Sequence, residues 1–318
     1  MIGNSETGHS LMIAILSALA PLFLITALGY ALAALKFAGG ELWDALDHIT
    51  FYVFFPALLV KTLMRADLAS VPARDLVLVS FSSVTIMSGA LVAAYLLLER
   101  PVSGPVFTSF FQGAVRFQST ITVAISGALF GERGLTLSAL SVASIIPTVQ
   151  FYTVLVLLIF GRGNGEISFW PILQRLTTNP FTLACALGLA LNFTGAPDAL
   201  YDTSSILGAP AIALTMLAVG AGVDLASVHA AQNLVAANMA LRLIGMPLLV
   251  FGLCWLTGLS GLPRTVAIIA AAVPTAATAY TMARKMGGDA ELMAQIITFQ
   301  SIASTATLPL FIWLAQSS

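Results

Sequence analysis

The sequence predicts an all-α protein that crosses a membrane many times. Of its 318 residues, 58% are hydrophobic and 8% are charged, whereas soluble domains carry about 25% charged residues. The mean hydropathy is +0.97, and the apolar runs last about 20 residues, the length that a spanning helix needs. A transmembrane β-barrel would show short alternating strands instead. Two of the apolar runs, near residues 112–126 and 273–280, are interrupted by polar residues or proline.

Ten spans fit the chain. They are expected at residues 11–35, 42–63, 76–98, 105–130, 135–160, 175–194, 203–223, 231–257, 263–285 and 290–315. The first span lacks a basic leader and is too long for a signal-peptide core, so we expect it to be retained. Glycines between the fifth and sixth spans indicate a flexible linker. The predicted units are residues 1–160, the linker 161–171, and residues 172–318.

The two units resemble each other in sequence. Residues 21–32 in the first span and 180–191 in the sixth share a proline, an Ala-Leu-Gly triplet and a trailing Ala-Leu at equal spacing. The tight turn predicted at Gly131 has a counterpart at Gly288. Five spans per unit force the second unit to insert upside down, and such inverted repeats are typical of secondary transporters.

Lysines and arginines in short loops predict the orientation. One side holds Lys36, Arg100, Arg162, Arg175, Arg284 and Lys285, and the other holds Arg65, Arg74, Arg133 and Arg264. This bias is weak, but it predicts that the linker lies inside and that both termini lie outside the cytoplasm.

The fourth span carries unusual polarity at membrane depth. Arg116 is followed by Gln118, Ser119 and Thr120, and such groups cost free energy in hydrocarbon unless they are paired or line a cavity. Arg116 either extends to the lipid headgroups or pairs with an anionic substrate. The hydroxyls either pack helices together or form part of a substrate site, and the cluster favours the site.

The ninth span is interrupted by Pro274, with Thr275 and Thr278 beside it. Proline removes a backbone donor and so breaks the helix. A break exposes the N-terminus of a half-helix, whose partial positive charge suits a carboxylate. Two interrupted segments at corresponding positions of two halves predict a substrate site near the middle of the membrane.

Other polar residues in the spans are candidates for ion coupling or support. Arg242 lies in apolar sequence, with Asn238 one turn before it. Arg242 is expected either to form an ion pair with Asp224 or to contact a charge on the substrate. Gln300 and Gln150 make the tenth and fifth spans partly polar, so they are candidates to support the broken segments.

The second span begins with three titratable groups, Asp44, Asp47 and His48. Such a cluster is either a solvated helix start or a site of proton coupling. Sodium coupling is the other possibility, because the fourth, ninth and tenth spans offer many oxygen atoms. No bound cofactor is expected.

Composition and motifs argue against other functions. A net charge of -1 without a basic block argues against nucleic acid binding. Cys185 and Cys254 lie in apolar runs and predict neither a disulfide nor a metal site. Asp202 and Asp224 leave an intramembrane hydrolase as a remote alternative, although their motif is irregular. No phosphate loop or metalloprotease motif occurs, so we expect no enzyme.

The chain resembles the auxin efflux carrier family over almost its whole length. The resemblance rests on residues 51–59 in the second span, 129–132 after the fourth, 217–223 in the seventh, and 274–280 running into 283–290. The last stretch is the most specific. The family includes bacterial relatives of the plant auxin exporters and is related to the sodium–bile acid symporters.

The resemblance implies ten transmembrane helices in two inverted five-helix repeats, with helices 4 and 9 broken and crossing. It implies a scaffold of helices 1, 2, 6 and 7, a homodimer through scaffold helices 2 and 7, and a moving transport domain of helices 3–5 and 8–10. The implied activity is elevator-type transport of a small organic anion, such as auxin or malonate, across a cell membrane, here expected to be a bacterial inner membrane.

The sequence departs from the family at the crossover. An asparagine is common in each broken helix, but Gln118 lies near the first position and Thr278 occupies the second. The usual proline of the fourth helix is absent, and residues 125–127 occupy that region. Because of these differences, an organic anion other than auxin is as plausible a substrate as auxin itself.

Overall fold

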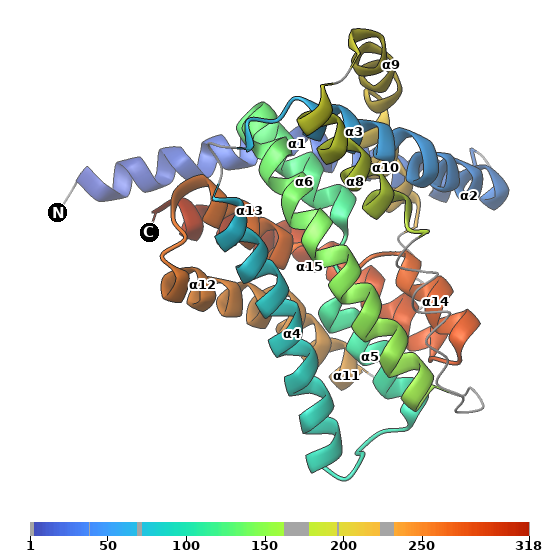
Figure 1. Ribbon diagram of the computed structural model, residues 1–318. Coiled ribbons are helices and arrows are strands. Elements are labelled where there is room, and N and C mark those ends of the chain that lie inside the picture. The colour runs from blue at the N-terminus through green and yellow to red at the C-terminus, as the bar shows by residue number, and fades with distance from the viewer. Residues whose placement is uncertain are drawn as a thin grey trace.

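The computed structural model describes residues 3–37, 39–68, 72–161, 178–195, 197–222 and 232–317. All regular secondary structure in these ranges is helical (Figure 1). Seven helical stretches are long and apolar enough to cross a membrane, and Pro180–Thr194 and Gly261–Ala272 are shorter apolar helices. The predicted class, an all-α multi-pass membrane protein, is therefore confirmed. The predicted linker 161–171 lies outside the described residues except for Gly161.

The helices follow the expected spans closely. In chain order they are α1 (Gly3–Ala34), α2 (Gly40–Ile49), the π-helix η1 (Thr50–Phe54), α3 (Phe55–Met64), α4 (Ala73–Leu97), α5 (Gly104–Val115), α6 (Ser119–Phe160), α8 (Pro180–Thr194), α9 (Asp198–Gly208), α10 (Ala211–Ala221), α11 (Gln232–Ala240), the π-helix η3 (Leu241–Gly245), α12 (Met246–Thr257), α13 (Gly261–Ala272), α14 (Thr278–Met286) and α15 (Ala290–Ser317).

The long range of α6 contains the tight turn predicted at Gly131. Gly131 has φ 57° and ψ -144°, which no α-helix contains. A Cβ at Gly134 would lie 2.0 Å from the Ser126 carbonyl oxygen, and one at Gly127 would lie 2.7 Å from Leu135. Residues eight apart in a straight helix are separated by about 12 Å, so the chain folds back on itself at Gly131.

Two groups of helices can be distinguished in space. The first group is α1, α2, α3, α8, α9 and α10, and the second group is α4, α5, α6 and α11–α15 (Figure 1). Within the first group, α1 packs along α10 and α3 packs along α8. The backbones approach closely, since a Cβ at Gly220 would lie 1.8 Å from the Thr26 carbonyl oxygen, and small residues permit such packing in membranes.

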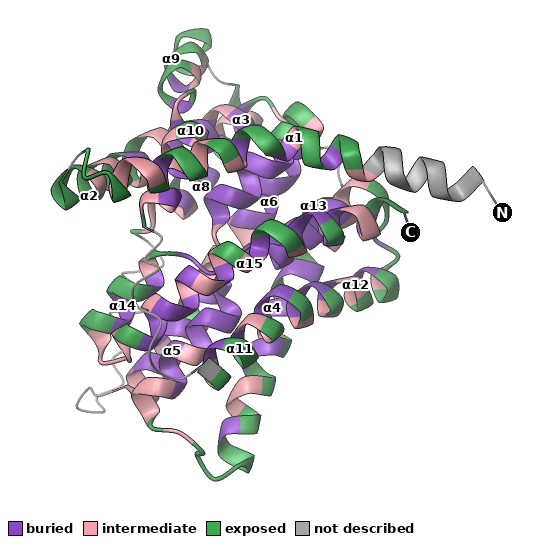
Figure 2. Cartoon of the chain, turned by 180° about the vertical axis from the view of Figure 1, so that it is seen from behind, coloured by how far each residue is buried: buried purple, intermediate pink, exposed green. Residues whose placement is uncertain are grey.

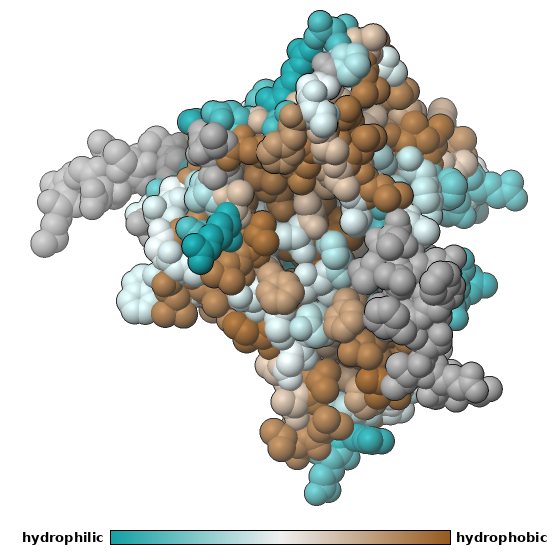
Figure 3. All heavy atoms as spheres, viewed as in Figure 1, coloured by the Kyte–Doolittle hydropathy of each residue, from teal (hydrophilic) through white to brown (hydrophobic). Residues whose placement is uncertain are grey.

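Burial and hydropathy follow the expected membrane pattern. Buried residues concentrate along α5, α6 and α13, whereas α2 and α9 are largely exposed (Figure 2). Large apolar side chains such as Leu97, Phe193 and Trp255 are exposed, as expected for helices that face lipid. On the face in Figure 3, hydrophobic residues are interspersed with residues of intermediate hydropathy across the middle, and hydrophilic residues gather at outlying parts such as α9.

The fourth and ninth spans are both broken, and the breaks meet. Arg116 (φ -70°, ψ 151°) and Gln118 (φ -85°, ψ 91°) are extended between α5 and α6. Val273 (φ -69°, ψ 152°) is extended after α13, because the residue before a proline avoids helical geometry. The Gln118 amide donates to the Pro274 carbonyl oxygen at 2.9 Å. Residues 116–118 and 273–277 together are called the crossing below.

One expectation about the crossing was wrong. The crossover of the fourth span was expected near residues 125–127, but these residues are helical within α6. The break lies at Arg116–Gln118 instead. There the Gln118 amide, which a continuous helix would pair within itself, donates to a carbonyl oxygen of another broken span.

Candidate functional site

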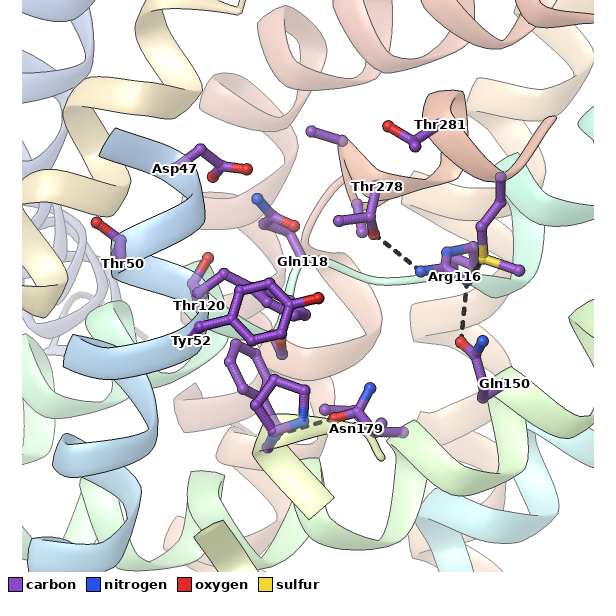
Figure 4. Close-up of a pocket in the computed structure, with 18 of the residues that line it drawn as sticks. Asp47, Thr50, Tyr52, Arg116, Gln118, Thr120, Gln150, Asn179, Thr278 and Thr281 are labelled. Atoms are coloured by element: carbon purple, nitrogen blue, oxygen red, sulfur yellow. Dashed lines mark hydrogen bonds between the residues drawn. The ribbon is translucent and has the colours of Figure 1, made fainter. Parts of the chain in front are cut away.

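A cavity of about 570 Å³ adjoins the crossing, between the two groups of helices. Its walls come from α2 and η1, from the crossing, from the middle of the fifth span, from the start of α8, from α10 and from α14 (Figure 4). The polar residues that line it are Asp44, Asp47, His48, Thr50, Tyr52, Arg116, Gln118, Ser119, Thr120, Gln150, Thr178, Asn179, Thr215, Thr278, Thr281 and Lys285.

Two helices begin at this cavity. The second half of the fourth span starts at Ser119, and the second half of the ninth starts at Thr278. A helix N-terminus carries about half a positive charge and unpaired amide groups. The Thr120 hydroxyl is buried and has no hydrogen-bond partner within the described part of the chain. The wall therefore offers polar groups and partial positive charge.

Arg116 connects the two broken helices. Its Nη2 donates to the Thr278 hydroxyl at 2.9 Å, and its Nη1 lies 2.9 Å from the Met282 sulfur and 3.4 Å from Gln150 Oε1 (Figure 4). The residue is 9% exposed. The guanidinium is thus held at the cavity wall by α14 and α6 rather than extended along a lipid-facing surface.

Pro274 and Thr275 are in the crossing but do not line this cavity. The Thr275 amide donates to Gln300 Oε1 at 2.8 Å, and its hydroxyl donates to the Gln112 carbonyl oxygen at 3.4 Å. Both residues are buried. Of the seven predicted binding residues, the structure therefore brings Arg116, Gln118, Ser119, Thr120 and Thr278 to the cavity.

The predicted support residues separate into two places. Asn238, Arg242 and Gln300 lie behind the crossing, where their side chains donate to backbone oxygens of the broken helices. Asp47 and His48 line the cavity itself and are exposed. The His48 ring stacks obliquely on Tyr52, with 4.5 Å between ring centroids.

Sequence reasoning missed several residues of the cavity wall. Asn179 caps α8, accepting from the amides of Phe181 and Thr182 at 2.9 and 3.2 Å. The Asn-Pro pair at the start of a helix is a recognisable N-cap signal, and it could have placed Asn179. No local signal marks Tyr52 or Thr281, because their place in the wall depends on how the two groups of helices pack.

The remote hydrolase alternative lacks a site in the described residues. Asp202 is exposed on α9, and Asp224 lies outside the described residues. No group of three or more His, Cys, Asp or Glu that could hold a metal ion occurs in the part of the chain that the structure describes.

Comparison with known proteins agrees with this architecture. Residues 14–312 match the family described as membrane transport protein. An uncharacterized transporter from Methanothermobacter thermautotrophicus is 26% identical over 315 residues, which cover 98% of each chain.

Proposed function

Because this chain belongs to the family of membrane transport proteins, as its resemblance to the auxin efflux carriers predicts, we propose that it moves a small organic carboxylate across the membrane as a secondary transporter. The protein is a transporter and not an enzyme. The observation that carries the choice of substrate is the crossing, where two helix N-termini and Arg116 adjoin one cavity.

The electrostatics of the wall favour an anion. The N-termini at Ser119 and Thr278 contribute partial positive charge, which favours a carboxylate. Arg116 places a guanidinium group at the cavity wall, where it contacts Thr278, Gln150 and Met282. Gln118, Ser119 and Thr120 supply hydrogen bonds to the same ligand.

The rest of the cavity wall carries charges of both signs, from Lys285 and from Asp44 and Asp47. Lys285 on α14 offers a second cation, which suits the far carboxylate of a dicarboxylate such as malonate. Asp47 and His48 lie across the cavity on the first group of helices, and they are the candidates for proton coupling. Sodium coupling is the alternative that the related bile acid symporters suggest.

The proposed mechanism is an elevator within ten transmembrane helices arranged as two inverted repeats. The first group of helices would be the scaffold, dimeric through its second and seventh spans, and the second group would carry the crossing through the membrane. The close backbone packing of α1 on α10 supports a rigid scaffold. The expected setting is a bacterial inner membrane with both termini outside the cytoplasm.

Ligand-dependent thermal stability tests this proposal. The detergent-purified protein is heated with a panel of mono- and dicarboxylates, including malonate and auxin, in sodium and in choline buffers. A ligand at a hundredfold excess over its Kd stabilises the folded state by about 2.7 kcal/mol, so a true substrate class should raise the melting temperature clearly. No stabilisation by any anion, with the protein monodisperse, would refute an anionic substrate.

Substitutions then test the site. Gln118→Ala and Thr278→Ala should weaken stabilisation by the carboxylate more than they lower the stability of the free protein. Thr305→Val is a matched control, because Thr305 is exposed and its hydroxyl bonds only to the Ile302 carbonyl of its own helix in the described structure. Unchanged transport by both alanine variants would disprove the assignment of this cavity.

A further inference from the structure

A second cavity, of about 530 Å³, lies between the two groups of helices at a distance from the crossing. Its walls include the end of α3, part of α9, the residues just after the turn at Gly131, and the start of α13. Among the described residues, none lines both this cavity and the one at the crossing. The helix from Ser119, at the crossing, to the turn at Gly131 is about 18 Å long. The second cavity, called the far cavity below, therefore lies at the opposite end of that helix.

Two ion pairs lie at the far cavity, and they are the ion pairs found among the described residues. Lys61 Nζ lies 2.8 Å from Glu132 Oε1, and this pair joins α3 of the first group to the second group. Arg65 pairs with Asp198 of α9, so this contact stays within the first group. The Arg65 guanidinium also lies over the Tyr201 ring, 3.8 Å from its centroid. Only the Lys61–Glu132 pair crosses from one group to the other.

The two members of this pair are held by different groups of helices. Lys61 is 15% exposed, and α3 packs so closely on its neighbours that a Cβ at Gly188 of α8 or at Gly208 of α9 would lie 2.9 Å from an α3 atom. Glu132 is 71% exposed and follows Gly131, the residue at which the second group turns back. Any displacement of one group along the other therefore acts directly on this pair.

Between the two cavities, α3 and α8 pack against α6 (Figure 1), and this interface is called the seam below. Cys185 of α8 lies at the seam, with its Sγ 3.9 Å from the Ala139 carbonyl oxygen of α6, and both residues are buried. Six residues before Cys185, Asn179 lines the cavity at the crossing. Seven residues after it, Asn192 donates at 2.9 Å to the carbonyl oxygen of Ala66, which lines the far cavity. The Cys185 thiol is therefore a native reporter at the middle of the seam.

We propose that Lys61 and Glu132 are positioning residues whose ion pair holds the far end of the seam closed in this conformation and must break when the second group moves. The inference rests on the proposed function for the relative motion of the two groups, but not for the substrate. A contact made in only one of two states biases the equilibrium by its own free energy. Because exposed pairs contribute little, this pair can be broken and remade in every transport cycle.

The first test measures the labelling rate of Cys185 by a maleimide in the detergent-purified protein, with mass spectrometry of the labelled peptide. Loss of an exposed ion pair shifts an equilibrium about 1.4- to 5-fold, so Glu132→Gln and Lys61→Gln should raise the rate by that factor. Asp198→Asn is the matched control, because it removes the same charge at the same cavity but breaks the pair within the first group. Cys254, at 1% exposure in α12, shows that the protein stays folded. Equal rates in Glu132→Gln and Asp198→Asn would overturn the proposal.

The second test uses salt and charge reversal. The Debye length falls to about 3 Å in 1 M salt, which weakens an exposed pair. Labelling of Cys185 in the wild-type protein should therefore rise between 10 mM and 1 M sodium chloride, whereas in Glu132→Gln it should not. Lys61→Glu combined with Glu132→Lys should restore both the slow rate and its dependence on salt. A purely structural role of either side chain would not produce this rescue, so its failure would contradict the proposal.

A reversible crosslink separates this inference from the proposed function. Lys61→Cys with Glu132→Cys, bridged by a short bis-methanethiosulfonate reagent, should stop uptake of malonate or auxin into proteoliposomes until dithiothreitol removes the bridge. The same bridge between Arg65→Cys and Asp198→Cys, within the first group, should not. Undiminished uptake with the first bridge in place would refute the role of the pair and leave transport standing. If neither probe is taken up but labelling of Cys185 depends on the pair, the substrate assignment fails and the role of the pair stands.

Discussion

Replacing Gln300 by methionine should cost about 2 kcal/mol of unfolding free energy. Gln300 is fully buried and joins α15 to both broken helices through three hydrogen bonds, to the Thr275 amide, the Gly113 carbonyl and Asn238 Oδ1. Side-chain hydrogen bonds between membrane helices contribute about 0.6 kcal/mol each on average and at most about 1.7. Methionine has a similar shape and makes none of the three, so their sum gives the estimate.

Unfolding of the detergent-purified protein by increasing SDS, followed by tryptophan fluorescence, measures this change. Thr305→Val on the same helix is the control and should leave the unfolding free energy nearly unchanged, since its hydroxyl bonds within its own helix. Combining Gln300→Met with Asn238→Leu should cost less than the sum of the two single changes, because residues in contact are energetically coupled. A loss no larger than that of the control would refute the role of Gln300 in holding the crossing.

Three further predictions concern the cavity wall and the packing of the two groups. Thr278→Val should lower the affinity for the stabilising carboxylate roughly tenfold, because it removes one hydrogen bond to a charged group. Thr278→Ser keeps the hydroxyl and should not lower the affinity. Thermal titration measures both. Glu132→Gln removes the 2.8 Å ion pair with Lys61. The change should lower the free energy of unfolding by at most about 1 kcal/mol, but it should change the transport rate. Reversing both charges should restore the rate measured in proteoliposomes. Gly220→Leu should lower the melting temperature sharply. Gly252→Leu should not, because an added Cβ at Gly252 would meet no atom within 4 Å.

The break in the ninth span could be predicted from sequence because its cause is local. Pro274 forces Val273 out of helical geometry, and the structure places the break there. The fourth span has no proline near its break, since Pro105 lies in the first turn of α5. The break therefore depends on contacts with distant residues, above all the bond from the Gln118 amide to Pro274. Polarity located the right region, whereas the expected family position at residues 125–127 was wrong.

The composition of the site could be predicted only in part for a related reason. Arg116, Gln118 and Thr278 belong to polar runs that interrupt apolar sequence, and they line the cavity. Thr275 belongs to such a run too, but its amide and hydroxyl are used by Gln300 and the Gln112 carbonyl. Which face of a broken segment meets the cavity depends on these long-range partners, and the sequence does not specify them.

The shortness of α5 and α13 has a consequence for biosynthesis. Each has 12 residues, about 18 Å of helix, which is less than the roughly 30 Å hydrocarbon core. The carbonyl end of α5 receives its donor from Gln300, 187 residues later in the chain. At about 5–20 residues per second, the ribosome reaches that donor roughly 10–40 s after the acceptor. During this interval the carbonyl end of α5 lacks the donor that Gln300 later supplies. We therefore expect a chain that ends before the last helix to be less stable than the complete chain.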